Sequence, residues 1–551
     1  MLEKSETSPP LPATAPTATK GSAPRQPPTD PNRLPEFEVI FRQNDPDDPK
    51  NWPMWYRMWA IATVSFSAWV VVLFSTSYTG ALPGLMEEFN VIKTYATMGM
   101  TTYLLGLAVG SLIVAPMSEL FGRRIVYLVG LAVWAVFIIP CGVAECLTTI
   151  LASRFVGALF GAALISNGPG TVVDVSKPEY LAMGMSLFSL GPFNGPVLGP
   201  LIGGFVYEYL GWRWTNWVVL VLAGLAFSMM VTVKETYAPR ILRKRADKLR
   251  KDTGDSRWWC HYDRTVSSWQ LISTNMKRPV VLFLTEPIVW FINVWNALIY
   301  GILYLCFVAY PVVFAQHRGW SAGFAGMSYL GIGAGIVLAI AVEPIVRRII
   351  SSRPCDPVTG KPPPEAAALI MVVGSLLTPI GQLGFAWTCL PTSVHWIVPI
   401  LFGVPFGFGN TLSFIYSSNY LAGAYGIYAA SALASNAVIR SLFGATLPLA
   451  GSKMYEAISP QWAGTLCGVL AVVMIPVPFV FWRYGAKIRS KSRTIRLLRE
   501  QQEALDTKKA EEQAKRDNCS SSDGQLALDS DPSIGLSRPQ VKITQLGKRE
   551  K

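Results

Sequence analysis

The stretch Gly191–Phe205, GPFNGPVLGPLIGGF, is apolar enough to lie in a bilayer, yet it is dense in glycine and proline. The small and helix-bending positions are Gly191, Pro192, Gly195, Pro196, Gly199, Pro200, Gly203 and Gly204. Glycines four residues apart form one smooth helix face, against which another helix packs closely in lipid. The prolines remove amide donors and favour bends. We therefore expect this stretch to be buried in protein or to line a cavity; the alternative is a tightly packed structural helix.

The composition is that of an integral membrane protein. Of 551 residues, 51% are hydrophobic and 15% are charged. Apolar runs of about 20 residues recur, as membrane-spanning helices require. Eight cysteines are scattered without a CxxC pair and only three histidines occur, so we expect no metal site. The formal net charge of +13 is explained by the placement of lysine and arginine described below. We therefore expect no nucleic-acid partner.

Twelve apolar segments are predicted to be membrane-spanning helices. They cover residues 58–82, 96–117, 125–145, 148–171, 182–209, 214–233, 281–312, 324–347, 366–388, 395–420, 427–450 and 462–483. We predict an all-α protein with five regions. These are a disordered cytosolic N-terminal tail (1–56), a six-helix bundle (57–233), a basic cytosolic central loop (234–280), a second six-helix bundle (281–484) and a cytosolic C-terminal tail (485–551).

Lysine and arginine are distributed asymmetrically. Residues 1–57 contain seven of them, residues 234–278 contain twelve, and residues 483–551 contain sixteen. The loops on the other side hold only Lys93, Arg213, Arg318 and Lys453. Because cytosolic loops carry the excess of positive charge, both termini and the central loop are expected in the cytosol. The expected location is the plasma membrane, with the vacuolar membrane as the alternative.

Two six-span halves around a basic loop indicate a duplicated transporter, whose substrate binds between the halves near the middle of the membrane. A receptor or a channel is the alternative, although an even division is unusual for either. No GxxxxGK[ST] phosphate loop occurs, so ATP hydrolysis is not expected. No nucleophile–base or metal constellation indicates an enzyme.

Several motifs resemble one family. The quoted stretches are Pro116–Arg124 (PMSELFGRR), Arg154–Gly161 (RFVGALFG), the glycine–proline stretch, and KETYAPRIL from Lys234. From about Asn44 to Arg489 the chain resembles the major facilitator superfamily, specifically its fungal twelve-span drug:proton antiporter branch. The resemblance implies the major facilitator fold of two six-helix bundles.

The loop after the second span resembles the superfamily's first signature, with Glu119 in place of the usual aspartate and with Gly122, Arg123 and Arg124 matching. Gly122 permits a tight turn. Glu119 is expected at the amino end of a cytosolic helix, where the helix dipole is positive. Arg123 is expected to bridge to Asp174. The resemblance implies a cytosolic latch that closes when the protein opens outward; the alternative is ordinary anchoring of charges at the membrane edge.

The glycine–proline stretch resembles the family's antiporter signature, which is associated with exporters. The resemblance also links Arg154 to proton coupling, and an arginine within a span is functional by default because it is costly there. Glu286 and Arg440 are the other coupling candidates at membrane depth. The alternatives are a structurally paired arginine for Arg154 and a helix-start acid for Glu286.

A cavity lined by aromatic rings and a few polar groups would suit a bulky amphiphile. The candidates are Asn293, Asn296, Tyr300, Gln382, Asn410, Tyr416 and Asn419. The first three share one helix face. For each residue the alternative is simple packing between helices.

We therefore predict a secondary active efflux transporter without a bound cofactor, driven by the proton gradient. Its expected partners are the lipid bilayer, protons and a small lipophilic organic substrate such as a drug, toxin or secondary metabolite, and it is expected to be a monomer. One alternative is a polyamine exporter, which acidic residues in the cavity would favour. Another is a non-transporting sensor, which would typically carry a larger cytosolic domain.

Overall fold

The computed structural model describes residues 37–42, 44–177, 179–263, 268–353, 363–492, 494–497 and 500. The chain forms two compact units, Met1–Ser492 and Arg493–Lys551, and the helices discussed below belong to the first. The described residues of the second unit are helical. The predicted tails lie outside the described residues over 1–36 and 501–551.

Seven helices form the first half of the chain. They are α1 (Met54–Gly80), α2 (Leu82–Phe89), α3 (Lys93–Phe121), α4 (Arg123–Gly142), α5 (Leu147–Val175), α6 (Leu181–Leu210) and α7 (Trp212–Thr232). Six correspond to the predicted spans, and α2 is a short helix between the first two. Gly122 and Gly211 precede α4 and α7 with φ of 93° and 86°. This backbone conformation favours glycine, and it lets the chain leave one helix and start the next at once.

The second half contains more helices than predicted because several spans are divided. The elements are α8 (Ala238–Thr253), α9 (Ser268–Thr285), α10 (Pro287–Pro311), the π-helix η3 (Val312–His317), α11 (Ala322–Met327), α12 (Leu330–Ser351), α13 (Glu365–Thr388), α14 (Ile397–Tyr425), η4 (Gly426–Tyr428), α15 (Ala429–Ala457), α16 (Pro460–Val473) and α17 (Pro476–Lys491). Pro287 and Pro476 follow two of the breaks, since proline has no amide hydrogen with which to continue a helix.

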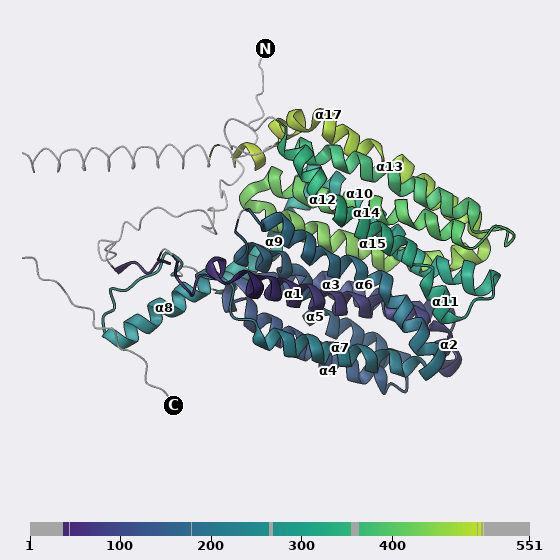
Figure 1. Ribbon diagram of the computed structural model, residues 1–551, viewed down its shortest axis with the longest axis horizontal. Helices are drawn as coiled ribbons and strands as arrows, with labels where there is room; N and C mark the ends of the chain where they lie inside the picture. Colours follow the sequence, from purple (N-terminus) through teal and green to yellow (C-terminus); the bar gives the residue numbers. More distant parts are fainter. Residues whose placement is uncertain are drawn as a thin grey trace, which may run out of the picture. The chain divides into compact units, whose positions relative to one another are not determined.

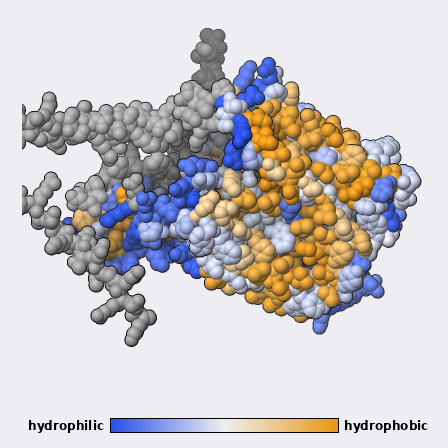
Figure 2. Space-filling model, viewed as in Figure 1, coloured by the Kyte–Doolittle hydropathy of each residue, from blue (hydrophilic) through white to orange (hydrophobic). Residues whose placement is uncertain are grey.

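The surface of the helices is suited to lipid. Eleven helices in the described residues are long and apolar enough to cross a membrane. The remaining predicted span corresponds to α6, which has 30 residues. Large apolar side chains such as Val221, Leu284 and Val473 are strongly exposed. Figure 2 shows a broad hydrophobic face over the helices, with hydrophilic residues gathered toward the helix ends.

The helices of each half pack mainly among themselves, and a few join the halves. In the first half α1 packs along α6, and α3 and α4 pack on α5; in the second half α13 and α12 pack on α14, and α10 packs on α15. Across the halves, α3 contacts α15, and α6 contacts α11 and α12. Figure 1 shows the purple and blue helices of the first half beside the green and yellow helices of the second.

The two ends of the spans differ in charge. The basic end is defined here as the end that carries Arg57, Arg123, Arg124, Lys234 and Arg489, and the other is called the opposite end. Helix α8 lies at the basic end (Figure 1). The short helices α2 and α11 precede or follow spans at the opposite end.

The prediction of disorder for residues 1–56 is wrong over the described part of that tail. Val39 N–H donates to the Trp259 carbonyl at 2.9 Å, and Val39 shares a small core with Leu242 and Ala246 of α8. Arg245 binds Asp45 at 2.6 Å. The predicted central loop is largely helical, since it contains α8 and the start of α9. Residues four apart give α8 an apolar face, which the N-terminal tail covers.

Candidate functional site

The glycine face of α6 lies against α1 along its length. A Cβ atom at Gly191 or at Gly203 would collide with the carbonyl oxygens of Ser65 or Ser77 of α1. At Gly195 it would lie 3.0 Å from the Trp69 carbonyl oxygen. Any larger side chain would therefore push the two helices apart, which explains the spacing of four in physical terms.

Hydroxyl groups of α1 replace the hydrogen bonds that two α6 prolines cannot make. Pro192 and Pro200 have no amide to donate to the carbonyls of Phe188 and Pro196, four residues earlier. Ser65 Oγ donates to the Phe188 carbonyl at 2.9 Å, and Thr76 Oγ1 donates to the Pro196 carbonyl at 2.9 Å. Sequence reasoning missed both hydroxyls; their signal is a serine and a threonine in an apolar span.

The same helix touches the second half near the opposite end. A Cβ atom at Gly204 would collide with the Ala322 carbonyl of α11, and one at Gly326 would lie 2.6 Å from the Pro200 carbonyl. Nearer the middle, the rings of Phe193 (α6) and Phe414 (α14) meet at 4.9 Å. Helix α6 is therefore placed between α1 and the second half, not on the lipid face.

The charged cluster at the basic end is centred on Arg123. Its Nε donates to Asp174 at 3.0 Å and its Nη1 donates to Ser118 Oγ at 2.8 Å. Both charged side chains are mostly enclosed. Glu119 does not begin a helix as expected, because α3 continues through it and ends at Phe121. The Glu119 backbone carbonyl accepts a bond from Arg243 of α8 at 3.3 Å.

Glu235 is a member of this cluster that sequence reasoning quoted but did not assign. Its carboxylate accepts the backbone N–H of Arg123 at 2.9 Å and that of Arg124 at 3.3 Å. It also accepts the N–H groups of Thr236 and Tyr237, each at 3.0 Å. The signal was an acid directly after the sixth span. Burial raises the pKa of Tyr237 to about 12, so this phenol stays neutral above Arg123, whose Cζ lies 5.2 Å from the ring centroid.

Gly122 and Arg124 complete the cluster. A Cβ atom at Gly122 would collide with the Glu235 carboxylate, so the glycine gives the acid access to the start of α4. Arg124 Nη2 donates to the Val231 carbonyl at the end of α7 at 2.9 Å. The cluster therefore joins the ends of α3, α4, α5 and α7 to the segment that leads into α8.

Arg154 is enclosed in the first half and is only 1% exposed. Its Nε donates to the Gly99 carbonyl at 2.7 Å, and its Nη2 donates to the carbonyls of Phe74 and Ser75 at 2.8 and 3.2 Å. Aromatic rings surround it: its Cζ lies 4.4 Å from the Phe74 centroid and 4.5 Å from that of Tyr78. No carboxylate of the described residues pairs with it. The charge is stabilised by backbone dipoles of α1 and α3.

Arg440 lies in the middle part of α15 and is stacked between two rings. Its Cζ is 4.5 Å from the Phe414 centroid and 5.2 Å from the Tyr300 centroid. It is surrounded by protein but keeps partial exposure, and Tyr300 and Phe414 are partly exposed as well. Since Phe414 meets Phe193, this group spans the junction of the halves. We call these four residues the junction cluster.

Among the predicted cavity residues, only Tyr300 belongs to the junction cluster. Asn293 and Asn296 lie elsewhere in this structure, and their role as lining residues stays a prediction. Both are buried, and they pair with Asn436 of α15 at 3.0 Å each, so they hold α10 to α15. Asn410 is buried and donates to the Ile299 carbonyl at 3.3 Å. The others do not join the cluster: Gln382 and Tyr416 are buried and Asn419 is exposed.

Glu286 lies at the basic end between three helices, away from Arg154 and Arg440. It is the N-cap residue of α10, although its side chain makes no capping hydrogen bond, and it is 4% exposed. Its carboxylate accepts bonds from Tyr425 Oη at 3.2 Å and Ser492 Oγ at 2.7 Å. An arginine side chain remains protonated at physiological pH, so Arg154 and Arg440 can act only as fixed charges. Of the three coupling candidates, Glu286 is the only carboxylic acid.

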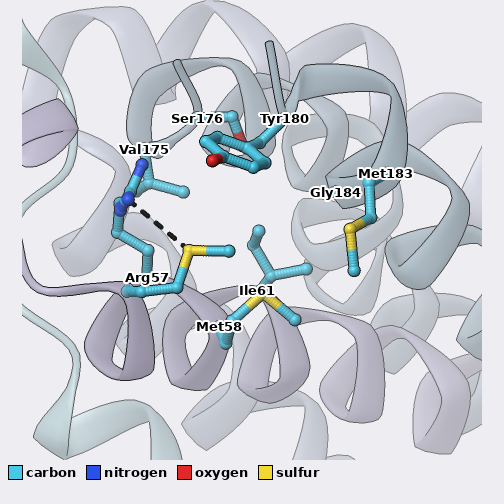
Figure 3. A pocket seen from close by; sticks show the side chains of 9 residues that line it. Arg57, Met58, Ile61, Val175, Ser176, Tyr180, Met183 and Gly184 are labelled. Atoms are coloured by element: carbon cyan, nitrogen blue, oxygen red, sulfur yellow. Dashed lines mark hydrogen bonds between the residues drawn. The ribbon is translucent and has the colours of Figure 1, made fainter.

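A small pocket also opens at the basic end. It is lined by residues of α1, α5 and α6 and of the turn between α5 and α6, with Tyr180 facing α1 across it (Figure 3). Arg57 Nη2 contacts Met54 Sδ at its edge at 3.5 Å. Its lining comes from the first half alone, so it is separate from the junction of the halves.

Comparisons with known proteins agree with this architecture. The family model of the Major Facilitator Superfamily matches residues 64–445. A citrinin biosynthesis cluster MFS transporter of Monascus ruber is 37% identical over 459 residues, which cover 82% of this chain and 90% of the relative. The multidrug transporter mdrA of Aspergillus fumigatus is 38% identical over 464 residues, covering 83% and 75%.

A solved structure shows the same fold. The proton:xylose symporter XylE matches with a TM-score of 0.55 over 79% of this chain and 96% of that chain. At 14% sequence identity this likeness concerns the fold alone. The predicted all-helical membrane fold is confirmed. The chain therefore belongs to the Major Facilitator Superfamily, and it is a membrane transporter similar to fungal efflux transporters rather than an enzyme.

Proposed function

We propose that this protein exports a small lipophilic organic compound, a drug or a secondary metabolite, in exchange for protons. The observation that carries the proposal is the placement of α6. Its glycine face packs on α1, and Gly204 touches α11 of the other half. A helix of this kind can transmit a rocking movement between the halves, because close backbone packing allows sliding without large side chains in the way.

Glu286 is proposed as the group that takes up and releases the proton, with Arg154 as a fixed charge that organises the first half. The Glu286 carboxylate is buried and accepts hydrogen bonds from the hydroxyls of Tyr425 and Ser492. Arg154 bonds to carbonyls of both α1 and α3. Its charge thereby ties the positions of three spans together.

The cluster around Arg123 is proposed to be the latch of the basic end. Arg123 of α4 links to α3 through Ser118 and to α5 through Asp174, and Gly122 and Arg124 place the start of α4 against Glu235. Glu119 contributes through its bond with Arg243. Breaking these contacts would release α8 and the end of α5 when the halves separate at this end.

The basic end is proposed to face the cytosol of a cell whose plasma membrane holds the protein. The support is the excess of lysine and arginine in the segments at this end, including twelve between Lys234 and Arg278. The substrate would then be taken up from the cytosol and released at the opposite end. The vacuolar membrane is the alternative location.

Transport into vesicles tests the proposal directly. Inverted vesicles that contain the full chain, with and without an imposed pH gradient, are given a panel of lipophilic compounds. Accumulation that follows the gradient is expected. Accumulation that ignores the gradient would eliminate antiport, and no accumulation of any compound would eliminate export.

A pair of variants tests the coupling residue. Glu286→Gln keeps the size of the side chain but cannot ionise, so substrate exchange is expected to continue while dependence on the gradient is lost. Glu179→Gln removes an exposed acid from a turn at the same end and serves as the control. Unchanged gradient dependence in Glu286→Gln would refute the proposed role of this residue.

The charge at the junction argues against the polyamine alternative. A polyamine is a multiple cation and would require carboxylates at its site. The charged side chain of the junction cluster is Arg440 instead, which would repel it.

A further inference from the structure

The charge of Arg440 has no partner within the described protein. No hydrogen bond or ion pair joins its guanidinium to a described residue, and its enclosed Nε has no acceptor. Its contacts are the faces of Phe414 and Tyr300, at 4.5 and 5.2 Å. Cation–π contacts supply part of the stabilisation, but they do not satisfy the N–H donors of a guanidinium.

The carboxylates of the second half are engaged elsewhere. Glu343 binds Arg347 at 2.6 Å and Glu365 binds Arg489 at 2.8 Å. Glu286 is held by Tyr425 and Ser492. Position 456 is sixteen residues further along α15, about 24 Å away at the helical rise per residue. Position 356 lies outside the described residues.

The first half supplies no carboxylate at this depth either. Its acids lie in the last turns of helices or in the connections between them: Glu87, Glu88, Glu119, Glu145, Asp174, Glu179 and Glu208. The nearby amides are also engaged, because Asn293 and Asn296 bond to Asn436. A positive charge at the junction of the halves is therefore left for something that enters from outside.

We propose that Arg440 binds the anionic group of the transported compound, so that the substrates of this protein are aromatic organic acids. This inference rests on the proposed export function and names its substrate class. A guanidinium matches a planar carboxylate or an acidic enolate with two parallel hydrogen bonds. The rings of Phe193, Tyr300 and Phe414 offer apolar faces to the ring system of the same molecule.

The partial exposure of the cluster agrees with this role. A purely structural arginine is expected to be closed off and bonded, as Arg154 is. Arg440 instead keeps an intermediate solvent exposure, and both rings that it touches are partly exposed as well. Because Phe193 belongs to the other half, a bound acid would contact both halves and would sense their relative movement.

The test uses matched probes that differ only in charge. The probes are naphthalene, indole and biphenyl carboxylic acids and their primary amides, of which only the acids are ionised at pH 7. Binding is measured on the purified full chain by thermal shift and tryptophan fluorescence, and transport is measured in inverted vesicles. Wild-type protein is compared with Arg440→Gln, Arg440→Lys and the control Arg353→Gln, which removes an exposed charge at the basic end.

The expected result is selective for the acids. Arg440→Gln should weaken binding of the acids, and raise their KM, by about tenfold or more, as expected for the loss of charge-assisted hydrogen bonds. Binding of the amides should change less than twofold. Arg440→Lys should retain part of the preference, and Arg353→Gln should retain all of it.

Several outcomes would overturn the inference. A wild-type protein that binds the acids no better than the amides would do so, as would an Arg440→Gln variant that weakens both classes equally. The proposed export function fails separately, if neither class accumulates in vesicles or if accumulation ignores the pH gradient. The binding measurements still decide the role of Arg440 in that case, because they do not depend on transport.

Discussion

Two arginines inside the spans, Arg154 in the first half and Arg440 in the second, meet similar rings but different backbones. Each guanidinium lies about equally close to a phenylalanine ring, 4.4 Å from Phe74 and 4.5 Å from Phe414. Arg154 also reaches three backbone carbonyls, whereas Arg440 reaches none in the part of the chain that the structure describes. The difference shows that aromatic stacking places a buried cation, while the hydrogen bonds decide whether it is structural or open to a ligand.

The reason for the difference lies in the neighbouring helices. The α1 carbonyls that Arg154 binds belong to a helix held by the glycine face of α6, so they stay within reach. In the second half α10 and α15 satisfy their polar groups with each other through Asn293, Asn296 and Asn436. Among the described residues these amides bond to one another and not to Arg440.

The largest effect on stability is expected for Arg154→Met. The variant removes three hydrogen bonds to a charged group in a closed site, and we expect a loss of about 2–4 kcal/mol in the free energy of unfolding. Chemical unfolding of the purified protein in detergent measures it, with Arg353→Met as the surface control. A stability equal to that of the wild type would show that the carbonyl contacts do not hold this half together.

A substitution on α6 probes how the carbonyls of the first half are held. In Gly199→Ala the new methyl would collide with Thr76 Oγ1 and lie 2.9 Å from the Leu73 carbonyl, next to the Phe74 carbonyl that Arg154 binds. Overpacking of this kind costs about 1–3 kcal/mol. Transport should fall with stability. The control is Gly224→Ala on α7, where a Cβ meets nothing within 4 Å; equal losses in both variants would contradict the argument.

Removal of a single hydroxyl tests the same contact more gently. Thr76→Val keeps the shape of the side chain but leaves the Pro196 carbonyl without its donor, at a cost of about 1 kcal/mol. Thr446→Val, whose hydroxyl bonds to the Leu442 carbonyl on an exposed face, should change stability by less. The two unfolding midpoints should therefore differ, and coincident midpoints would refute the role of Thr76.

A third arginine, Arg245, provides the conventional carboxylate-paired case outside the spans. The hydrogen bonds from Arg245 lower the pKa of Asp45 to about 2, below its ordinary value of 3.8. A lowered carboxyl pKa stabilises the fold above pH 3.8, and the gain is lost as the pH falls from about 4 to 2. Hydrogen-exchange protection of the Val39 amide should decline in this range, by about 1 kcal/mol or less. Asp45→Asn should abolish this decline.

The smallest effect on stability is expected for Arg440→Met. Replacing an unpaired, enclosed charge by an apolar side chain of similar length should leave the free energy of unfolding unchanged, or raise it slightly. The same unfolding measurement gives the comparison with Arg154→Met. A loss as large as that of Arg154→Met would mean that Arg440 is structural after all, and would erase the contrast between the halves.

The sequence by itself determined the number and order of the spans and the inward face of α6. Runs of apolar residues are a property of the chain, and glycines four apart lie on one face of any helix. It also indicated that Arg123 and Asp174 are neighbours, since Arg123 lies at the start of one span and Asp174 at the end of the next, on the same side of the membrane. In the structure the two are in contact, with Arg123 Nε 3.0 Å from Asp174 Oδ2.

Only the tertiary structure decided what each face meets. The spacing of Asn293, Asn296 and Tyr300 predicts one shared face, but the partner helix α15 covers the two asparagines and leaves the tyrosine partly open. The sequence treats Arg154 and Arg440 alike, as charges within spans. Whether a carbonyl lies within reach depends on how helices distant in sequence approach each other, and helical periodicity carries no information about that distance.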